Sequence, residues 1–381
     1  MTSLGELFTR ASGSVSRHLV ERILCCTLAV WIAGQFVLME STFALLPFVS
    51  SAHLANIFHG LVTIVFIAGL VCTDIEPRPL TLVGCACAIF VTVATWRTTG
   101  DGHLAMLTIL SLAAKDIGLG RLARSWTIGA LVGLSLTLLL SLLGISASID
   151  TIVGTSFFPA LGFKHAGTFA YATFSIVVGI ALGMWHRRFL LPLGACSVGF
   201  GILLFAIQSA AHASLLLIVF GMCLLAFALW PRTITRIAAR PWVSMAVAAL
   251  PFVLFLLSID GPSLLGIDIF KESSYRSLPS AYGYSTIIFL YLLYALGLHT
   301  FTASTRPNSK WRAWVLLVSC TIYAAFLFDK SLSLQIEFNP TLLVLSCGFA
   351  NFLRTEREPG KQALARHFAP RASRERGGAH E

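Results

Sequence analysis

The residues best suited to chemistry stand in a short polar stretch between two long apolar runs. Lys164 and His165 supply positive charge there, flanked by Gly162 and Gly167. Glycine lets the backbone turn tightly or approach a ligand closely. Gly167 or Thr168 can cap the helix that begins there. That helix would direct its unpaired N–H groups and positive dipole end back at this stretch. The pattern predicts an anion-binding site, and the alternative is a plain polar turn between two membrane helices.

Two later polar segments, at about 260–282 and 329–337, hold further ionisable residues. Lysine and arginine can bind an anion there, and a carboxylate can accept a proton from a reacting hydroxyl. The candidates in these segments are Asp260, Asp268, Lys271, Tyr275, Arg276 and Glu337. The alternative for each charged residue is a solvated loop position, and for the tyrosine it is the aromatic belt at a membrane interface.

Several chemistries have no signature in the chain. The sequence contains no P-loop, no G-x-G-x-x-G, no H-E-x-x-H and no G-x-S-x-G. The nine cysteines lie in or beside apolar runs without zinc-ligand spacing, which fits helix packing. His59 and His212 also fall in apolar runs, where a histidine is more often packed and hydrogen-bonded than a proton relay. We therefore expect no metal and no cofactor.

Long apolar segments must position the candidate residues. Of the 381 residues, 56% are hydrophobic and 12% charged, whereas about a quarter of a soluble domain is charged. Runs of about 20 apolar residues suffice to cross a hydrocarbon core of roughly 30 Å. The expected fold is all-α, a polytopic integral membrane protein with about 12 transmembrane helices (range about 10–12). The predicted spans are 23–39, 53–72, 79–95, 103–114, 126–148, 168–185, 189–207, 213–230, 242–259, 283–303, 312–328 and 338–353.

These spans form one polytopic membrane domain over residues 1–353. Residues 354–381 are rich in arginine and small polar residues, and we expect a basic, disordered cytoplasmic tail there. If the N-terminus is cytoplasmic, 22 of the 27 lysines and arginines fall in inner segments and five in outer ones. The positive-inside rule predicts this bias and places both termini in the cytoplasm. The net charge of +10 is then a topology signal, so no nucleic acid is expected as a partner.

The order of features resembles a known family. Ala113-Ala114-Lys115-Asp116-Ile117 ends one predicted span, and Ala160-Leu161-Gly162-Phe163-Lys164-His165 leads from an outer loop into another. A late stretch, Glu337-Phe338-Asn339-Pro340, enters the final predicted span. Together these resemble the Wzy-like oligosaccharide repeat-unit polymerases of bacterial capsule, exopolysaccharide and O-antigen pathways. Ala166-Gly167 stands where many family members have Pro-Asn.

The resemblance implies glycosyl transfer at the outer face of a bacterial cytoplasmic (plasma) membrane, with a polyprenyl-diphosphate-linked oligosaccharide as substrate. Lys164, His165 and Arg276 are the expected catalytic cations, and Glu337 the expected catalytic carboxylate. The donor already stores the energy, so no cofactor is implied. Membrane lipids and other polysaccharide-export proteins are the further expected partners. The residues expected to bind substrate are Gly162, Gly167, Asp260, Asp268, Lys271 and Tyr275.

Other functions remain open. An O-antigen ligase-like transferase would use the same class of donor but usually has one very large outer loop. A lipid-linked oligosaccharide flippase or another transporter usually lines a central cavity with charges, whereas this chain carries most of its charges in loops. A membrane acyltransferase would show an early histidine and paired arginines, which are not evident.

Overall fold

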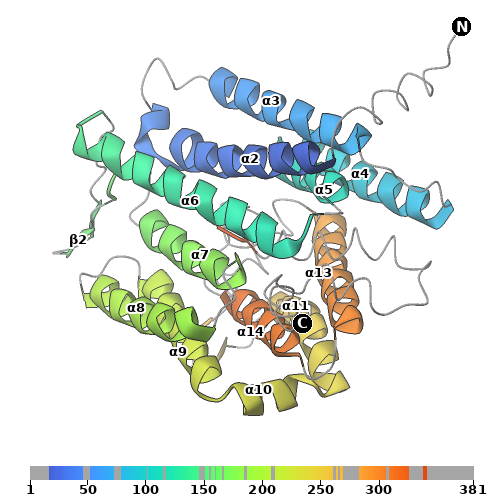
Figure 1. The fold of residues 1–381 in the computed structure, drawn as a ribbon. Helices are drawn as coiled ribbons and strands as arrows, with labels where there is room; N and C mark the ends of the chain where they lie inside the picture. Colours follow the sequence, from blue (N-terminus) through green and yellow to red (C-terminus); the bar gives the residue numbers. More distant parts are fainter. Residues whose placement is uncertain are drawn as a thin grey trace, which may run out of the picture.

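α-Helices dominate the computed structural model (Figure 1). It describes residues 17–45, 52–72, 79–100, 102–114, 117–145, 151–153, 156–158, 160–164, 167–183, 187–206, 211–260, 263–264, 267–268, 283–305, 309–325 and 338–340. The N-terminal helices are α2 (Arg17–Gln35), α3 (Ala52–Val71), α4 (Pro79–Thr99), α5 (His103–Ala113) and α6 (Leu119–Leu142). The later helices are α7 (Thr168–Gly183), α8 (Arg187–Ala206), α9 (Ala211–Leu229), α10 (Pro231–Ala238), α11 (Pro241–Asp260), α13 (Tyr284–Ser304) and α14 (Lys310–Ala325).

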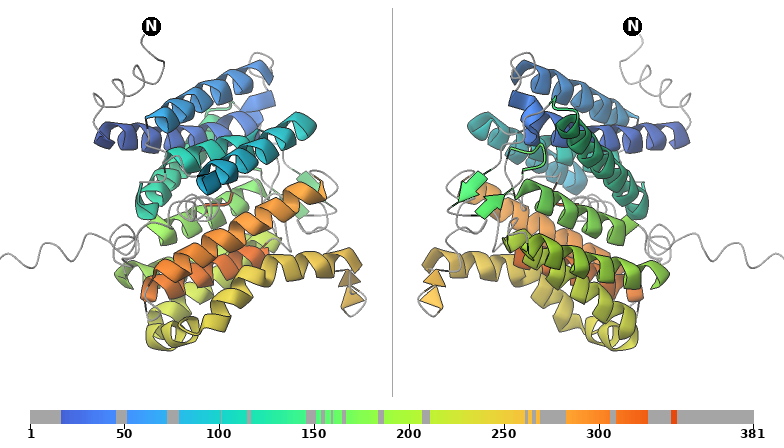
Figure 2. Two further views of the ribbon diagram at one scale, coloured as in Figure 1. Left: turned by 90° about the vertical axis from the view of Figure 1, so that its right-hand side faces the viewer. Right: turned by 90° about the vertical axis from the view of Figure 1, so that its left-hand side faces the viewer.

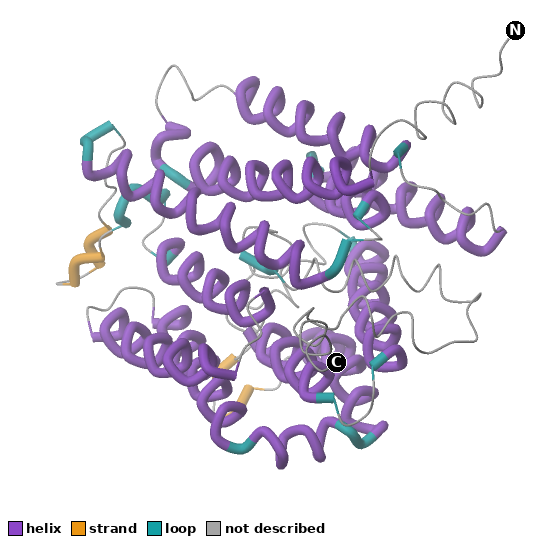
Figure 3. Tube along the Cα trace, in the orientation of Figure 1, coloured by secondary structure: helices purple, strands orange, loops and turns teal. Residues whose placement is uncertain are grey.

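Smaller elements complete the described chain. A π-helical turn η1 (Phe36–Glu40) continues α2 and is followed by a 3₁₀ turn η2 (Thr42–Leu45). Two short antiparallel hairpins were not predicted (Figure 3). They pair β1 (Thr151–Val153) with β2 (Ser156–Phe158), and β3 (Ser263–Leu264) with β4 (Ile267–Asp268).

Eleven of the twelve predicted spans coincide with described helices, which confirms the all-α expectation at the level of the elements. The twelfth, 338–353, lies outside the described residues except for 338–340. By length and apolarity, the described residues include six helices able to cross a membrane, or seven if α9 and α10 form one bent span. α5 and α7 are apolar but shorter. The protein thus has the helices of a multi-pass membrane protein, and the count of about twelve crossings stays a prediction.

The largest boundary difference is at α6, predicted at 126–148 and observed at Leu119–Leu142. Gly144 ends this helix with a φ of 69°. The amide of Ile145 donates to the carbonyl of Leu140 at 3.0 Å, and the amide of Gly144 to Ser141 at 3.0 Å. This pair of bonds is a Schellman cap, which satisfies the last carbonyls of the helix. Apolarity alone could not reveal it, because the residues around the cap are apolar too.

α6 packs closely on α2 through two glycines one turn apart. A methyl group on Gly129 would lie 2.3 Å from the carbonyl oxygen of Ala29, and one on Gly133 would lie 3.0 Å from that of Ala33. This G-x-x-x-G spacing lets two membrane helices approach until their backbones touch. The register also shows that α2 and α6 run parallel.

α7 is enclosed by other helices and lies between the N-terminal group and α8–α14 (Figures 1 and 2). Twelve of its 16 residues are buried. Trp314 of α14 donates its indole N–H to the carbonyl of Ala181 at 3.1 Å, and the ring of Phe174 packs on Phe220 of α9. At about 1.5 Å per residue, α7 is shorter than a hydrocarbon core.

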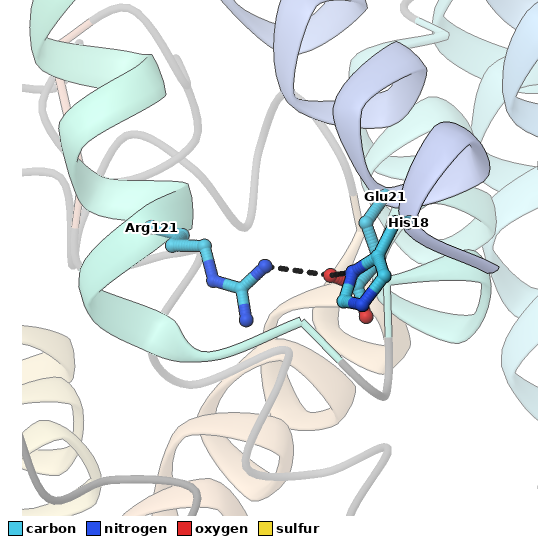
Figure 4. A network of polar contacts seen from close by, with 3 residues as sticks. All are labelled: His18, Glu21 and Arg121. Carbon is cyan, nitrogen blue, oxygen red and sulfur yellow. Dashed lines mark hydrogen bonds and ion pairs between the residues drawn. The ribbon is translucent and has the colours of Figure 1, made fainter. Parts of the chain in front are cut away.

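Basic side chains tie the helix ends opposite the start of α7. Arg121 of α6 binds the carboxylate of Glu21 of α2 at 2.6 Å, and His18 lies 3.8 Å from the same carboxylate (Figure 4). Arg124 donates its Nε–H to the carbonyl of Gly183, the last residue of α7, at 3.1 Å. A cation at a helix C-terminus interacts favourably with the helix dipole. These contacts bring the starts of α2 and α6 and the end of α7 to one side of the bundle.

Candidate functional site

The predicted polar stretch is docked on the end of the first described helix. Residues 160–164 meet η1 and the two residues after it, and Ser41 forms an antiparallel bridge with Phe163. The amide of Thr42 donates to the carbonyl of Gly162 at 2.8 Å, and the amide of Lys164 donates to Glu40 at 2.9 Å. The stretch, predicted as part of an outer loop, is therefore packed into the framework of the bundle.

Gly162 has two independent reasons to be glycine. Its φ is 87°, a conformation that L-residues rarely adopt. A methyl group there would lie 2.7 Å from the Cβ of Ser141 and 3.0 Å from the carbonyl of Thr137, both near the end of α6. Gly162, predicted to bind substrate, is buried in packing against α6.

Lys164 is half-buried and already has a partner. Its Nζ donates to the carbonyl of Met39 at 2.5 Å. Met39 is in the last turn of η1, where carbonyls lack helical donors and carry partial negative charge. A lysine ammonium has three N–H groups, so two remain able to bind an anion. The predicted catalytic cation therefore also stabilises a helix terminus.

The helix that follows begins where the sequence placed it. α7 starts at Thr168, and the amide of Tyr171 donates to the carbonyl of Gly167 at 3.1 Å. Gly167 is thus the N-cap residue, which confirms the predicted capping. The first N–H groups of α7 have no acceptor within the helix, so this end of the helix carries partial positive charge. It begins only a few residues after Lys164.

A second stretch from the resemblance contacts the same phenylalanine, Phe36, as the first. Phe338, Asn339 and Pro340 are buried. The ring of Phe36 contacts Phe163 at a centroid distance of 6.5 Å and Phe338 at 5.7 Å. Phe36 therefore joins two motifs that are far apart in the chain.

Polar contacts hold this second stretch in place. The hydroxyl of Ser175 in α7 donates to the carbonyl of Phe338 at 2.5 Å. The fully buried Asn339 hydrogen-bonds with Tyr294 of α13. Sequence reasoning missed Phe36, Ser175 and Tyr294, because each lies in an apolar helix with nothing local to mark it. What links these three residues to the site is a contact with Phe338 or Asn339, which only the structure reveals.

The structure describes little of the remaining predicted site residues. Asp260 is the last residue of α11, and Asp268 lies in β4 opposite Ser263; only their backbones are described. Five others lie outside the described residues: His165, Lys271, Tyr275, Arg276 and Glu337. Within the described ranges, no group of three or more His, Cys, Asp or Glu side chains could hold a metal ion.

The sequence also missed a polar contact inside the apolar bundle. Nε2 of Gln35 lies 2.5 Å from Nε2 of His59, and the rings of His59 and His103 are 5.3 Å apart. The ring of Trp31 lies 6.3 Å from that of His103. Gln35 is fully buried, and its Oε1 has no hydrogen-bond partner in the described chain. The expectation that His59 is hydrogen-bonded is confirmed, and α2, α3 and α5 each supply one member of the polar group.

The described site is thus a cationic turn before α7, joined to the Phe338–Pro340 stretch through Phe36. Gln35, the partner of His59, is the residue before Phe36. No family model, no curated protein and no solved structure matches this chain.

Proposed function

We propose that this protein polymerises polyprenyl-diphosphate-linked oligosaccharide repeat units at the outer face of a bacterial cytoplasmic membrane. The supporting observation is that Phe163 and Phe338, one from each stretch behind the resemblance, both pack on Phe36. Residues that serve one reaction must lie together in the fold. The two stretches are far apart in the chain, so nothing in the sequence required them to meet. A ligase-like transferase remains the nearest alternative, since it would need the same donor chemistry.

In this reaction the hydroxyl of an acceptor sugar attacks the anomeric carbon of the donor glycan. The bond from that carbon to the lipid diphosphate breaks, and the hydroxyl proton passes to a base. The leaving diphosphate is stabilised by cations and backbone N–H groups. Two N–H groups of Lys164 and the first turn of α7 are the described groups suited to that task.

Glu337 is our proposed base. It is bonded directly to Phe338, whose carbonyl accepts the hydrogen bond from Ser175. The backbone next to Glu337 is therefore anchored on α7, the helix whose first turn is proposed to receive the diphosphate. A carboxylate near the acceptor hydroxyl would act as general base.

Deleting the gene and sizing the surface glycan tests the proposal. Loss of long chains with one repeat unit still transferred supports a polymerase. Unchanged chain length with loss of transfer to the final acceptor supports a ligase, and loss of all glycan from the outer face supports a flippase. Either of the last two results overturns the proposal.

Transport is a second candidate, and the Gln35–His59–His103 group favours it. Ionisable residues within membrane helices often mark ion or substrate paths. Replacing His59 by Gln in purified, reconstituted protein distinguishes the two functions. A polymerase would keep extending externally supplied lipid-linked units, whereas a proton-coupled transporter would lose its dependence on a pH gradient.

A further inference from the structure

α10 differs from the other helices in direction and composition. It follows α9 after a bend of 101° at Trp230, with Pro231 as its first residue. Residues 230–245 contain three arginines and no Asp or Glu. Figure 1 shows α10 bridging the ends of α9 and α11.

The neighbours of α10 are helix ends. It links the last residue of α9 to the first of α11 and packs on α14. Arg312, in the first turn of α14, donates to the carbonyl of Thr302 in the last turn of α13 at 3.0 Å. Its other terminal nitrogen lies 3.5 Å from the hydroxyl of Ser244 in the first turn of α11. Four apolar helices therefore begin or end at this corner, so α10 lies at the level where they leave the hydrocarbon.

The side chains of α10 divide into three faces. At about 100° per residue, Thr235 and Ala238 fall on one face, and both are buried. Arg232 and Arg236 fall together on one flank and are exposed. Ile237 falls on the opposite flank and is 48% exposed. A helix lying along a membrane surface needs this arrangement, with a basic flank toward the headgroups and an apolar flank toward the acyl chains.

Aromatic residues mark both ends of the segment. Trp230 is 61% exposed and Trp242 is 58% exposed. Exposed tryptophans concentrate at membrane interfaces, where the ring meets acyl chains and the indole N–H reaches the headgroups. Arg240 and Lys310, both exposed, add positive charge at the same corner.

We infer that α10 is an interfacial helix whose arginines, Arg232, Arg236 and Arg240, bind the headgroups of anionic phospholipids. Charge complementarity selects this occupant, because the segment offers three guanidinium groups and no carboxylate. A guanidinium group forms paired hydrogen bonds with a phosphate. Its positive charge also favours headgroups with a net negative charge over zwitterionic headgroups, which have none. The inference is independent of the proposed polymerase reaction.

The test uses the full chain, extracted from nanodiscs of phosphatidylcholine and phosphatidylglycerol in equal amounts. Native mass spectrometry measures the ratio of the two lipids retained. The variant Arg232→Gln/Arg236→Gln is compared with Arg22→Gln/Arg97→Gln, which removes two exposed arginines from α2 and α4. A basic residue near an anionic surface is worth about fivefold in affinity, so the α10 variant should lose its phosphatidylglycerol preference by about 25-fold at low salt. An equal loss in both variants, or no loss in either, overturns the site.

A second measurement does not depend on arginine variants. Tryptophan fluorescence is quenched by phosphatidylcholine brominated near the headgroup end of its acyl chains, in the native protein and in Trp230→Phe/Trp242→Phe. Subtracting the emission of the variant from that of the native protein gives the emission of Trp230 and Trp242. We expect the brominated lipid to quench this emission strongly. If the emission lost with these two residues is not quenched by the brominated lipid, α10 does not lie in the interface and the inference is wrong.

Discussion

Lys164 shows how one side chain can serve both architecture and chemistry. Its amide and its ammonium both bind carbonyls at the end of η1, so part of its role is to hold residues 160–164 in place. The remaining two N–H groups are the ones available to a diphosphate. Any variant at this position therefore has to be judged on activity and abundance together.

Replacing Lys164 and His165 together by Gln should shorten the polymer strongly while the protein remains inserted. Glutamine keeps an N–H donor for Met39 but removes the charge that stabilises a leaving diphosphate. Loss of such a group costs roughly 10²–10³ in rate. The measurement is glycan length by gel, normalised to membrane protein abundance, and Lys164→Arg is the charge-preserving control. Full-length polymer from the double variant would remove this stretch from the active site.

Gly162→Ala should lower stability even though it adds a single methyl group. Forcing a left-handed φ on alanine costs about 1–2 kcal/mol, and the contacts with Ser141 and Thr137 add to that cost. Gly60→Ala is the matched control, because a methyl group on Gly60 in α3 meets nothing within 4 Å. Thermal unfolding in detergent should show a lower midpoint for Gly162→Ala and an unchanged or higher one for Gly60→Ala. Equal midpoints would mean that the turn at Gly162 relaxes freely.

At this scale the sequence predicted residue types better than contacts. Gly162, Lys164 and Gly167 were identified because glycine and charge stand out in an apolar chain. The partners of Lys164 could not be identified in this way, because Met39 and Glu40 bind it through backbone carbonyls, which every residue has. The Gln35–His59 contact was missed for another reason: its members lie on separate helices, and only packing brings them together.

Among the elements, α2 and α6 pack so closely that one added methyl group, at Gly129, would force them apart. Backbone atoms face Gly129, so an added methyl group has nowhere to move. The two helices would have to separate and lose the neighbouring contact at Gly133. The G-x-x-x-G spacing is visible in the sequence, but its partner helix is not.

We expect Gly129→Ala to destabilise the bundle by about 2 kcal/mol or more, within the range of overpacked sites. Gly199→Ala in α8 provides the comparison, because nothing lies within 4 Å of a methyl group there. Thermal melting and the fraction of protein extracted as a monodisperse species report the effect. A Gly129→Ala protein that melts with the native one would show that α2 and α6 do not touch as described.

Helix positions were predictable because apolar runs and polar breaks alternate along nearly the whole chain. Helix ends were less so where a cap decides them, as the Schellman cap at Gly144 does for α6. The residues of α10 were predicted as a polar connection between two spans, because an eight-residue helix with arginines on one flank does not form an apolar run. The resemblance named two stretches of the candidate site, and the packing of Phe36 between them could not have been read from either.

Across the whole molecule, contacts join helix ends in the pattern that alternating spans require. The start of α6 meets the start of α2 and the end of α7, while the end of α4 meets the start of α13 through the hydroxyls of Thr95 and Thr286 at 3.0 Å. The end of η1 meets the residues before α7. Each of these pairings joins ends that the charge pattern assigns to one membrane side. These pairings are the ones that alternating crossings would give, and the number of crossings and the sides of the membrane stay predictions.

Cysteine labelling tests the absolute sides. In a cysteine-free background, a cysteine at Gly261 should react with an impermeant thiol reagent in intact cells, whereas one at Arg236 should react only after the membrane is opened. Labelling at both positions after permeabilisation controls for access. The reverse pattern would place the start of α7 in the cytoplasm and rule out the proposed reaction at the outer face.

The position of Phe36 also has a consequence for how the protein is made. This ring emerges from the ribosome early, yet its cover at Phe338 is translated about 300 residues later. At roughly 5–20 residues per second, that is a delay of about 15–60 s. α2 to α6 can pack on one another during this interval, but the junction around Phe36 has to wait with one side uncovered. A chain terminated before Phe338 would therefore insert most of its helices and still expose this apolar surface, which makes it a natural substrate for membrane quality-control proteases.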